Sequence, residues 1–245
     1  MNSIIRTVEI PDISQRKVVK TAGFMFLFAF IVPTLNWAFV LSKFIVPENV
    51  MATAKNIIAN EQLFRIGITI ELIMSGGLIV LGVALYILLK QVNRNLSLLA
   101  LSLKLVEATI SANIVLVSFI VLQFVNGETY STGFTAEQLQ APVGFLLNVH
   151  TDLYSIPMLF LGLDMMIFSY LFFNSKYIPR ILSGFGILSF ALIFIHALIY
   201  IVAPEYAAMP INQIIFWTPS GIFEIIIGIW LLFKSGKVSE IKETN

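Results

Sequence analysis

The sequence contains no cysteine, and its charged residues are scarce. The lack of cysteine excludes disulfides, thiolate metal sites, iron–sulfur clusters and cysteine nucleophiles. Asp, Glu, Lys and Arg together make up 12% of the chain, about half of the ~25% that is usual in soluble domains. Fifteen Lys and Arg nearly balance fourteen Asp and Glu, so there is no basic patch or tail to neutralise phosphates. These shortages exclude a water-soluble enzyme, a disordered regulator and a nucleic-acid binder.

Apolar residues dominate what is present. They make up 58% of the chain, and its mean hydropathy is +0.91. A helix needs about 20 apolar residues to cross the roughly 30 Å hydrocarbon layer, and six runs reach that length: 22–41, 66–89, 98–122, 145–173, 181–203 and 211–233. In lipid, each backbone polar group must be satisfied within the protein. The sequence therefore predicts an all-α polytopic membrane protein, with residues 1–245 forming one domain of six transmembrane helices.

The basic residues predict the orientation of these spans. Eleven of them fall in the two terminal tails or in the loops after spans two and four: Arg6, Arg16, Lys17, Lys20, Lys90, Arg94, Lys176, Arg180, Lys234, Lys237 and Lys242. The opposite side has Lys43, Lys55 and Arg65. Because positive residues stay cytoplasmic, we expect both termini inside and a multi-pass protein of the cytoplasmic membrane. The polar first twenty residues do not form a cleavable signal, so span one is expected to act as a retained anchor.

The first two connections predicted on the outer side of the membrane differ in their sequence pattern. Residues 47–65 are amphipathic: Val50, Ala54, Ile57, Ile58 and Phe64 share one face, and Lys55, Asn56, Asn60 and Glu61 the other. This pattern predicts a helix lying along the outer surface between spans one and two. Residues 123–144 contain Gly, Thr and Ser but no basic residue, and we expect them to form an exposed connection.

Four segments together resemble a known family. They are ATAKNIIANEQLFRIG (52–67), VNRNLSLLALSLKLVEA (92–108), FNSKYIPRILSGFG (173–186) and PSGIFEIIIGIWLLFKSG (219–236). Their order and spacing are similar to those of a bacterial six-span family catalogued as domain of unknown function 4386. The resemblance implies a bacterial cytoplasmic membrane and six helices, but no established reaction. In FLGLDMMIFSY, Asp164 stands where the resemblance leads us to expect histidine, so a His-ligated site is not expected in that span.

Three acidic residues lie deep within predicted spans. Glu107 comes nine residues after the cytoplasmic start of span three, and Asp164 and Glu224 come nine residues before the cytoplasmic ends of spans four and six. Nine helical residues span about 14 Å, close to the middle of the bilayer. We therefore expect the three carboxylates to lie in one layer.

The environment expected of these acids suggests a binding site. Lys104 is spaced i, i+3 from Glu107 and is a natural counter-ion. The remaining carboxylates cannot both be ionised cheaply, so a proton or a cation should bind between them. Pro157 and Pro219 are expected to kink spans four and six beside the acids. Buried acids also serve simply as interhelical hydrogen-bond partners, and this structural interpretation stays open.

A second polar group is expected toward the outer face. It comprises Asn36, Glu71, Ser75, Asn113 and His196, with His150 and Asp152 near the outer mouth of span four. Imidazole and carboxylate suit metals, but the two histidines show no local spacing motif, and we expect neither a metal nor a cofactor. Small residues at Ser75–Gly77 and at Ser183, Gly184 and Gly186 favour close helix packing.

Three functions remain open from the sequence. The first is proton- or cation-linked binding or transport of a small solute, with Glu107, Asp164, Glu224 and Lys104 forming the site and the outer polar group the access route. The second is a membrane-embedded enzyme acting on a lipid or isoprenoid through His196, His150, Asp152 and Glu71. The third is a stress or immunity protein in which the acids only hold helices together. Membrane lipid is the expected surrounding, and a small solute or cation the expected partner.

Overall fold

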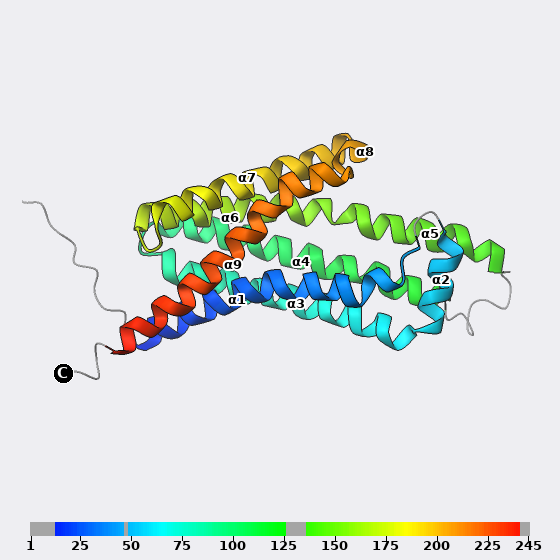
Figure 1. Cartoon of the computed structure of the whole chain (residues 1–245), viewed down its shortest axis with the longest axis horizontal. Helices are drawn as coiled ribbons and strands as arrows, with labels where there is room; N and C mark the ends of the chain where they lie inside the picture. Colours follow the sequence, from blue (N-terminus) through cyan, green and yellow to red (C-terminus); the bar gives the residue numbers. More distant parts are fainter. Residues whose placement is uncertain (1–12, 47–48, 126–135, 241–245) are drawn as a thin grey trace, which may run out of the picture.

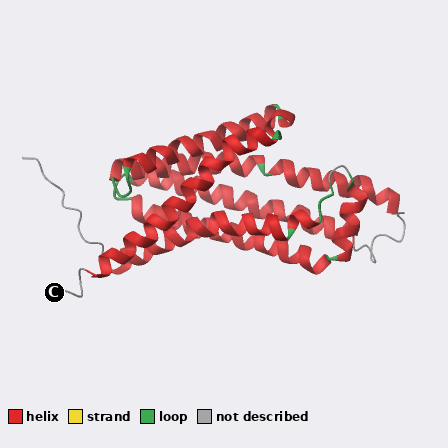
Figure 2. Ribbon diagram, viewed as in Figure 1, coloured by secondary structure: helices red, strands yellow, loops and turns green. Residues whose placement is uncertain are grey.

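The computed structural model describes residues 13–46, 49–125 and 136–240, and this part of the chain is helical without a strand (Figure 2). The helices are α1 (Ile13–Phe39), η1 (Leu41–Lys43), α2 (Val50–Ala59), α3 (Glu61–Leu89), α4 (Arg94–Val125), α5 (Ala136–Leu153), α6 (Ser155–Ser175), α7 (Arg180–Val202), α8 (Pro204–Ala207) and α9 (Pro210–Glu240). Six segments within the described residues are long and apolar enough to cross a membrane, which confirms the predicted number of spans.

The contacts between the six spans follow a closed order, in which each span packs against two neighbours. The helix α1 packs against α9 and α3, α4 against α3 and α6, and α7 against α6 and α9. Side chains that leave α4, α6 and α9 toward the middle of this ring can therefore meet, although α4 and α9 are not ring neighbours.

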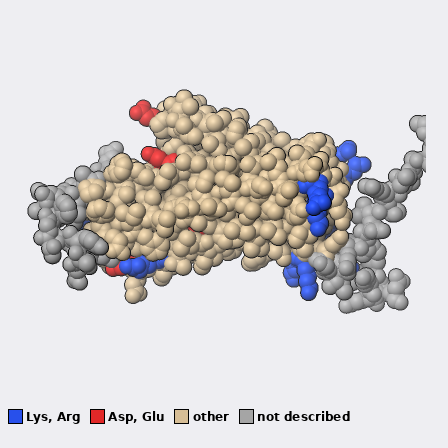
Figure 3. Space-filling model, turned by 180° about the vertical axis from the view of Figure 1, so that it is seen from behind, with Lys and Arg blue, Asp and Glu red and all other residues tan. Residues whose placement is uncertain are grey.

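Both ends of the described chain lie at the same end of the molecule. In Figure 1, α1 begins and α9 ends on the left, where the α3–α4 and α6–α7 connections also lie, while α2 and α8 lie at the opposite end. Figure 3 views the molecule from behind and shows most of the visible Lys and Arg at the end where α1 begins, with the visible acidic side chains mainly toward the other half. Arg6 and Lys242 of the predicted cytoplasmic set lie outside the described residues.

The amphipathic segment between spans one and two is helical, as its pattern indicates. The helix α2 lies across the ends of the long helices (Figure 1), and Asn49 caps it by accepting a hydrogen bond from the amide of Ala52, 2.9 Å away. Ile57 is fully buried in a cluster with Phe44 and Phe64, whose rings meet edge to face. Ile58, placed on the same apolar face by the sequence, is instead 55% exposed.

Span four is irregular beside its proline, whereas span six is not. The helix α5 ends at Leu153 and α6 begins at Ser155, with Tyr154 between them in a helical conformation, three residues before Pro157. The whole of 142–175 therefore still forms one span. The helix α9 continues through Pro219. The expected connection over 123–144 is shorter than predicted, because α4 runs to Val125 and α5 starts at Ala136; residues 126–135 lie outside the described part.

Candidate functional site

The first site is an ion cluster in the ring interior, which we define as Lys104, Glu107, Asp164 and Glu224. The Lys104 Nζ atom lies 2.6 Å from Oε2 of Glu107, one turn away on α4. The same ammonium lies 2.9 Å from Oδ1 of Asp164 on α6. The side chains of Lys104 and Asp164 are 0% exposed, and that of Glu107 is 2% exposed. One lysine therefore pairs with carboxylates from two neighbouring spans in the absence of solvent.

Asp164 is the less completely satisfied of these two carboxylates. Its contact with Lys104 has the distance of an ion pair, and Glu107 also interacts with it, but neither Asp164 oxygen has a well-aligned hydrogen-bond partner among the described residues. An ionised carboxylate accepts up to about four hydrogen bonds, and buried polar groups almost always have partners. Asp164 thus keeps acceptor capacity for a proton or a cation.

Glu224 is the member of the cluster that contacts none of the others. It lies on α9, whose neighbours are α1 and α7, and it is near enough to α4 for the charges of Lys104 and Glu107 to influence its ionisation. Its side chain is half-buried, and it forms no hydrogen bond or ion pair with the residues that the structure describes. Glu224 is therefore the most accessible member of the cluster and the one without a cation in contact.

Gly82 on α3 makes room for the cluster, and the sequence analysis did not identify it. A Cβ atom added at this position would lie 2.8 Å from Cγ and 3.3 Å from Cβ of Lys104, and 3.2 Å from Leu101. The lysine stem therefore packs directly against the backbone of α3. A single glycine in an apolar run gives no signal of such a contact without coordinates.

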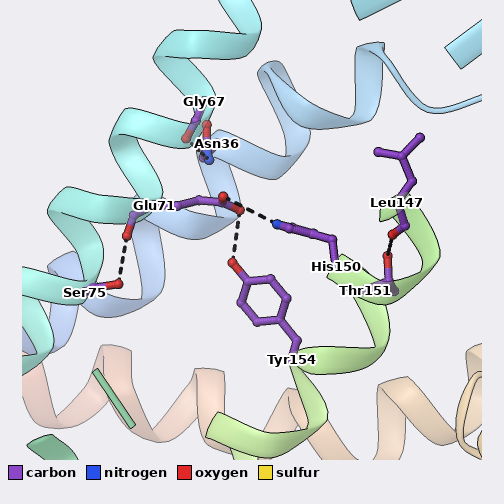
Figure 4. A network of polar contacts seen from close by, with 8 residues as sticks. All are labelled: Asn36, Gly67, Glu71, Ser75, Leu147, His150, Thr151 and Tyr154. Atoms are coloured by element: carbon purple, nitrogen blue, oxygen red, sulfur yellow. Dashed lines mark hydrogen bonds and ion pairs between the residues drawn. The ribbon is translucent and has the colours of Figure 1, made fainter. Parts of the chain in front are cut away.

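Three residues of the predicted outer polar group, Asn36, Glu71 and His150, lie near one another together with Tyr154. We call these four residues the outer cluster. Glu71 on α3 extends toward both His150 and Tyr154 (Figure 4). The hydroxyl of Tyr154 donates to Oε1 of Glu71 over 3.1 Å, and Nε2 of His150 lies 3.8 Å from Oε2 of Glu71. Tyr154 was not among the predicted site residues, because Pro157 indicates an irregularity in span four but not the direction in which the nearby side chains point.

His196 does not belong to the outer cluster. Its Nδ1 accepts a hydrogen bond from Nε1 of Trp217 over 3.2 Å, and its Nε2 lies 3.1 Å from the carbonyl of Ala207. Because Nδ1 accepts, Nε2 carries the proton and donates to that carbonyl. Both ring nitrogens are engaged in tying α7 to α8 and α9, so neither is free to ligate a metal or act as a base.

The other predicted outer residues are dispersed. Asp152 is exposed and accepts a hydrogen bond from Tyr200 over 3.2 Å. Asn113 is exposed and donates to the carbonyl of Thr109 on its own helix, and Ser75 donates in the same way to the carbonyl of Glu71. In the described part of the chain, no three His, Cys, Asp or Glu residues are grouped as metal ligands. The predicted outer group is therefore divided by the structure rather than assembled.

A ring of six spanning helices with buried charges in its interior defines a polytopic helical membrane protein. The family described as "Domain of unknown function (DUF4386)" matches residues 21–235, and the protein belongs to this family. No curated protein and no solved structure matches the chain.

Proposed function

We propose that this protein binds a proton or a small cation in the ion cluster and uses it to bind or carry a small solute across the membrane. The observation that carries the proposal is the single ammonium of Lys104 shared by Glu107 and Asp164, at 2.6 and 2.9 Å. Glu224 on α9 adds a third carboxylate whose ionisation depends on the charges of Lys104 and Glu107.

The balance of charge supports a bound proton or cation. Fully ionised, the cluster carries two more negative than positive charges, and each ion taken out of water into a low-dielectric interior is strongly disfavoured. Like charges held close together disfavour the ionised form further. A proton on one carboxyl group, or a cation among them, removes most of this unfavourable energy.

The exposure of the residues assigns them different roles. Lys104 and Asp164 have no exposed side-chain surface and hold the fixed part of the site, whereas half-buried Glu224 exchanges the proton or cation with the surroundings.

The test uses the purified protein in lipid vesicles that contain a pH-sensitive dye. We expect proton entry above that of protein-free vesicles when a pH gradient and a membrane potential are imposed, and we expect Glu107→Gln and Glu224→Gln to abolish the excess. Glu61→Gln is the matched control, because Glu61 is a solvent-accessible carboxylate paired with Arg65 at 2.6 Å. Flux that is unchanged in both cluster variants would contradict the proposal.

The second candidate function is structural. In this case the protein carries no solute, and the ion pairs of the cluster only hold α4 against α6. The complete burial of Lys104 and Asp164 between these neighbouring helices favours it. Glu224 distinguishes the two candidate functions, because it forms none of the ion pairs that hold α4 against α6. A purely structural role predicts that Glu224→Gln leaves both stability and biological activity unchanged, and that activity survives in the triple variant E107Q/D164N/E224Q.

A further inference from the structure

The ammonium of Lys104 occupies the position where the ion cluster would otherwise hold a cation. Its Nζ atom lies 2.6 Å from Oε2 of Glu107 and 2.9 Å from Oδ1 of Asp164. Because these oxygens come from α4 and α6, two neighbouring spans direct a carboxylate at one point. A positive charge that belongs to the chain itself fills that point, and the side chain that carries it is 0% exposed.

The stem of Lys104 is held in place by α3. It packs against Gly82, where an added Cβ would lie 2.8 Å from Cγ of the lysine. Protein interiors are close-packed, and few of their voids are larger than a water molecule. A second cation could take the same position only if the ammonium left it, which would bury the ammonium without its partners at a large cost in free energy.

The remaining carboxylate oxygens do not form an alternative site for a metal cation. Hard cations such as Ca²⁺ take about six to eight oxygen ligands. Glu224 forms no hydrogen bond or ion pair with the rest of the described chain, and within that part no three acidic or histidine side chains are grouped as ligands of one metal ion. The nearly complete burial of Glu107 and Asp164 leaves little room for water to supply the other ligands.

Backbone carbonyls do not supply these ligands either. Many secondary transporters coordinate Na⁺ with carbonyls of unwound helix segments near the membrane midplane. Here the chain is helical at Glu107, Asp164 and Glu224, so its carbonyls are engaged in helical hydrogen bonds. A proline frees the carbonyl four residues earlier. The carbonyls freed by Pro157 and Pro219 precede Asp164 and Glu224 by at least nine residues, a rise of about 14 Å or more.

A proton, in contrast, needs only one carboxylate and no set of ligands. Both oxygens of Asp164 are buried without a well-aligned hydrogen-bond partner among the described residues, and Glu107 interacts with Asp164. A protonated carboxyl group donates one hydrogen bond, so it can satisfy a neighbouring carboxylate while it removes one negative charge. Among the described residues of α1, α3 and α7, no charged side chain lies at this depth to do the same.

We propose that the ion cluster binds a proton and excludes alkali and other metal cations, because Lys104 takes the place of the cation. This inference rests on the proposed function and identifies its coupling ion: binding or transport of the solute is linked to protons alone. Lys104 thereby determines the ion selectivity of the site, and Glu224, which is half-buried, exchanges the proton with the surroundings.

The first test measures ion uptake by lipid vesicles that contain the purified full-length protein. We expect proton entry to be the same when Na⁺ is replaced by choline. We also expect no uptake of radioactive Na⁺ or Rb⁺ above that of protein-free vesicles. Uptake of either metal ion by the wild type that Glu107→Gln abolishes would overturn the inference. It would leave the proposed function in place, because the cluster would then carry a cation.

The second test removes the ammonium. In Lys104→Met, Glu107 and Asp164 face a vacated position, and we expect Na⁺ to bind there. Na⁺ should therefore raise the melting temperature of this variant relative to choline at equal ionic strength, by an amount that grows with the Na⁺ concentration. The wild type should melt at the same temperature in both salts. Lys90→Met is the matched control and should also show no difference, because Lys90 is an exposed lysine at the end of α3.

Two melting results would overturn the inference. They are a Lys104→Met variant that folds but does not respond to Na⁺, and a wild type that Na⁺ stabilises as much as it stabilises the variant. If Lys104→Met does not fold, the uptake of radioactive ions by the wild type decides the question. Failure of the proposed function itself is distinguishable, because proton flux would then be unchanged in Glu107→Gln and Glu224→Gln whichever salt is present.

Discussion

Lys104 is the side chain on which the ion cluster depends. Its ammonium contacts Glu107 and Asp164, and no exposed surface of its side chain remains for water. Removing one partner of a buried ion pair leaves an uncompensated charge, which is far more unfavourable than replacing the whole pair by neutral groups. The stability of the protein should therefore respond to the balance of charges in the cluster more than to any one contact.

Lys104→Met should therefore destabilise the protein. We expect the variant to lose about 3–5 kcal/mol of the free energy of unfolding, because two buried carboxylates lose their cation. Adding Asp164→Asn to that variant should restore part of the loss, so the two substitutions are not additive. Unfolding of the purified protein in detergent measures both. A loss below about 1 kcal/mol for Lys104→Met would show that the lysine is not paired as described.

Gly82→Ala should disturb the cluster without changing any charge. The added methyl group would lie 2.8 Å from Cγ of Lys104, and overpacking of this kind costs about 1–3 kcal/mol. Displacement of the lysine should also lower proton flux in vesicles. Gly76→Ala on the same helix is the control, because an added Cβ there meets nothing within 4 Å. Equal behaviour of the two variants would contradict the contact.

Counting residues along the predicted spans was enough to predict part of the ion cluster. The rise of a helix places Glu107, Asp164 and Glu224 at one depth, and the i, i+3 spacing pairs Lys104 with Glu107, which the structure bears out at 2.6 Å. Counting gives depth but not the direction in which a side chain points around its helix. For that reason the sequence analysis placed His196 with His150 and overlooked Tyr154 and Gly82.

Helices α6 and α7 approach closely where α6 has a glycine. A Cβ added at Gly162 would lie 2.8 Å from the backbone nitrogen of Phe194 on α7, and a backbone atom cannot move aside as the tip of a side chain can. Small residues at such crossings are how membrane helices gain van der Waals contact. The same helix carries Asp164 two residues later, so this contact also positions the ion cluster.

Gly162→Ala should therefore separate α6 from α7. We expect a loss of about 1–3 kcal/mol in the free energy of unfolding, together with reduced proton flux. Gly184→Ala on α7 is the control, since an added Cβ there meets nothing within 4 Å, and it should be neutral within about 1 kcal/mol. Thermal unfolding in detergent distinguishes them. Similar melting temperatures for Gly162→Ala and the wild type would show that the helices can shift without cost.

The existence of the long helices followed from sequence, whereas their contacts did not. Apolar runs of at least 20 residues predicted all six spans. Span four is irregular at Tyr154, close to the kink expected at Pro157, whereas Pro219 does not interrupt α9. Of the small residues expected at helix contacts, Gly77 and Gly186 pack closely but Gly76 and Gly184 face open space. Composition shows that close packing is possible, and only the rotation of each helix decides where it occurs.

On the face that Figure 3 shows, basic and acidic side chains lie mainly toward opposite ends of the molecule. The end where α1 begins carries most of the visible Lys and Arg, and the positive-inside rule predicts that this end faces the cytoplasm. The predicted orientation would place the outer cluster toward the opposite side of the membrane. It would also decide from which side the ion cluster receives its proton or cation.

The absence of cysteine allows this orientation to be tested directly. Single cysteines introduced at Lys55 and Glu205 should react with a membrane-impermeant maleimide added outside intact cells. Cysteines at Lys90 and Lys176, in the loops at the opposite end, should react only after the membrane is opened. Labelling in the reverse pattern would invert the orientation and exchange the sides from which the two sites are reached.

The most direct test of the ion cluster is infrared spectroscopy of the purified protein in lipid, which detects protonated carboxyl groups by their C=O stretch. At neutral pH, we expect a band from a protonated carboxyl group of the ion cluster, or its appearance when alkali cations are removed, and its loss in Glu224→Gln but not in Glu61→Gln. A spectrum with every carboxylate ionised, unaffected by cations and identical in Glu224→Gln, would contradict the account.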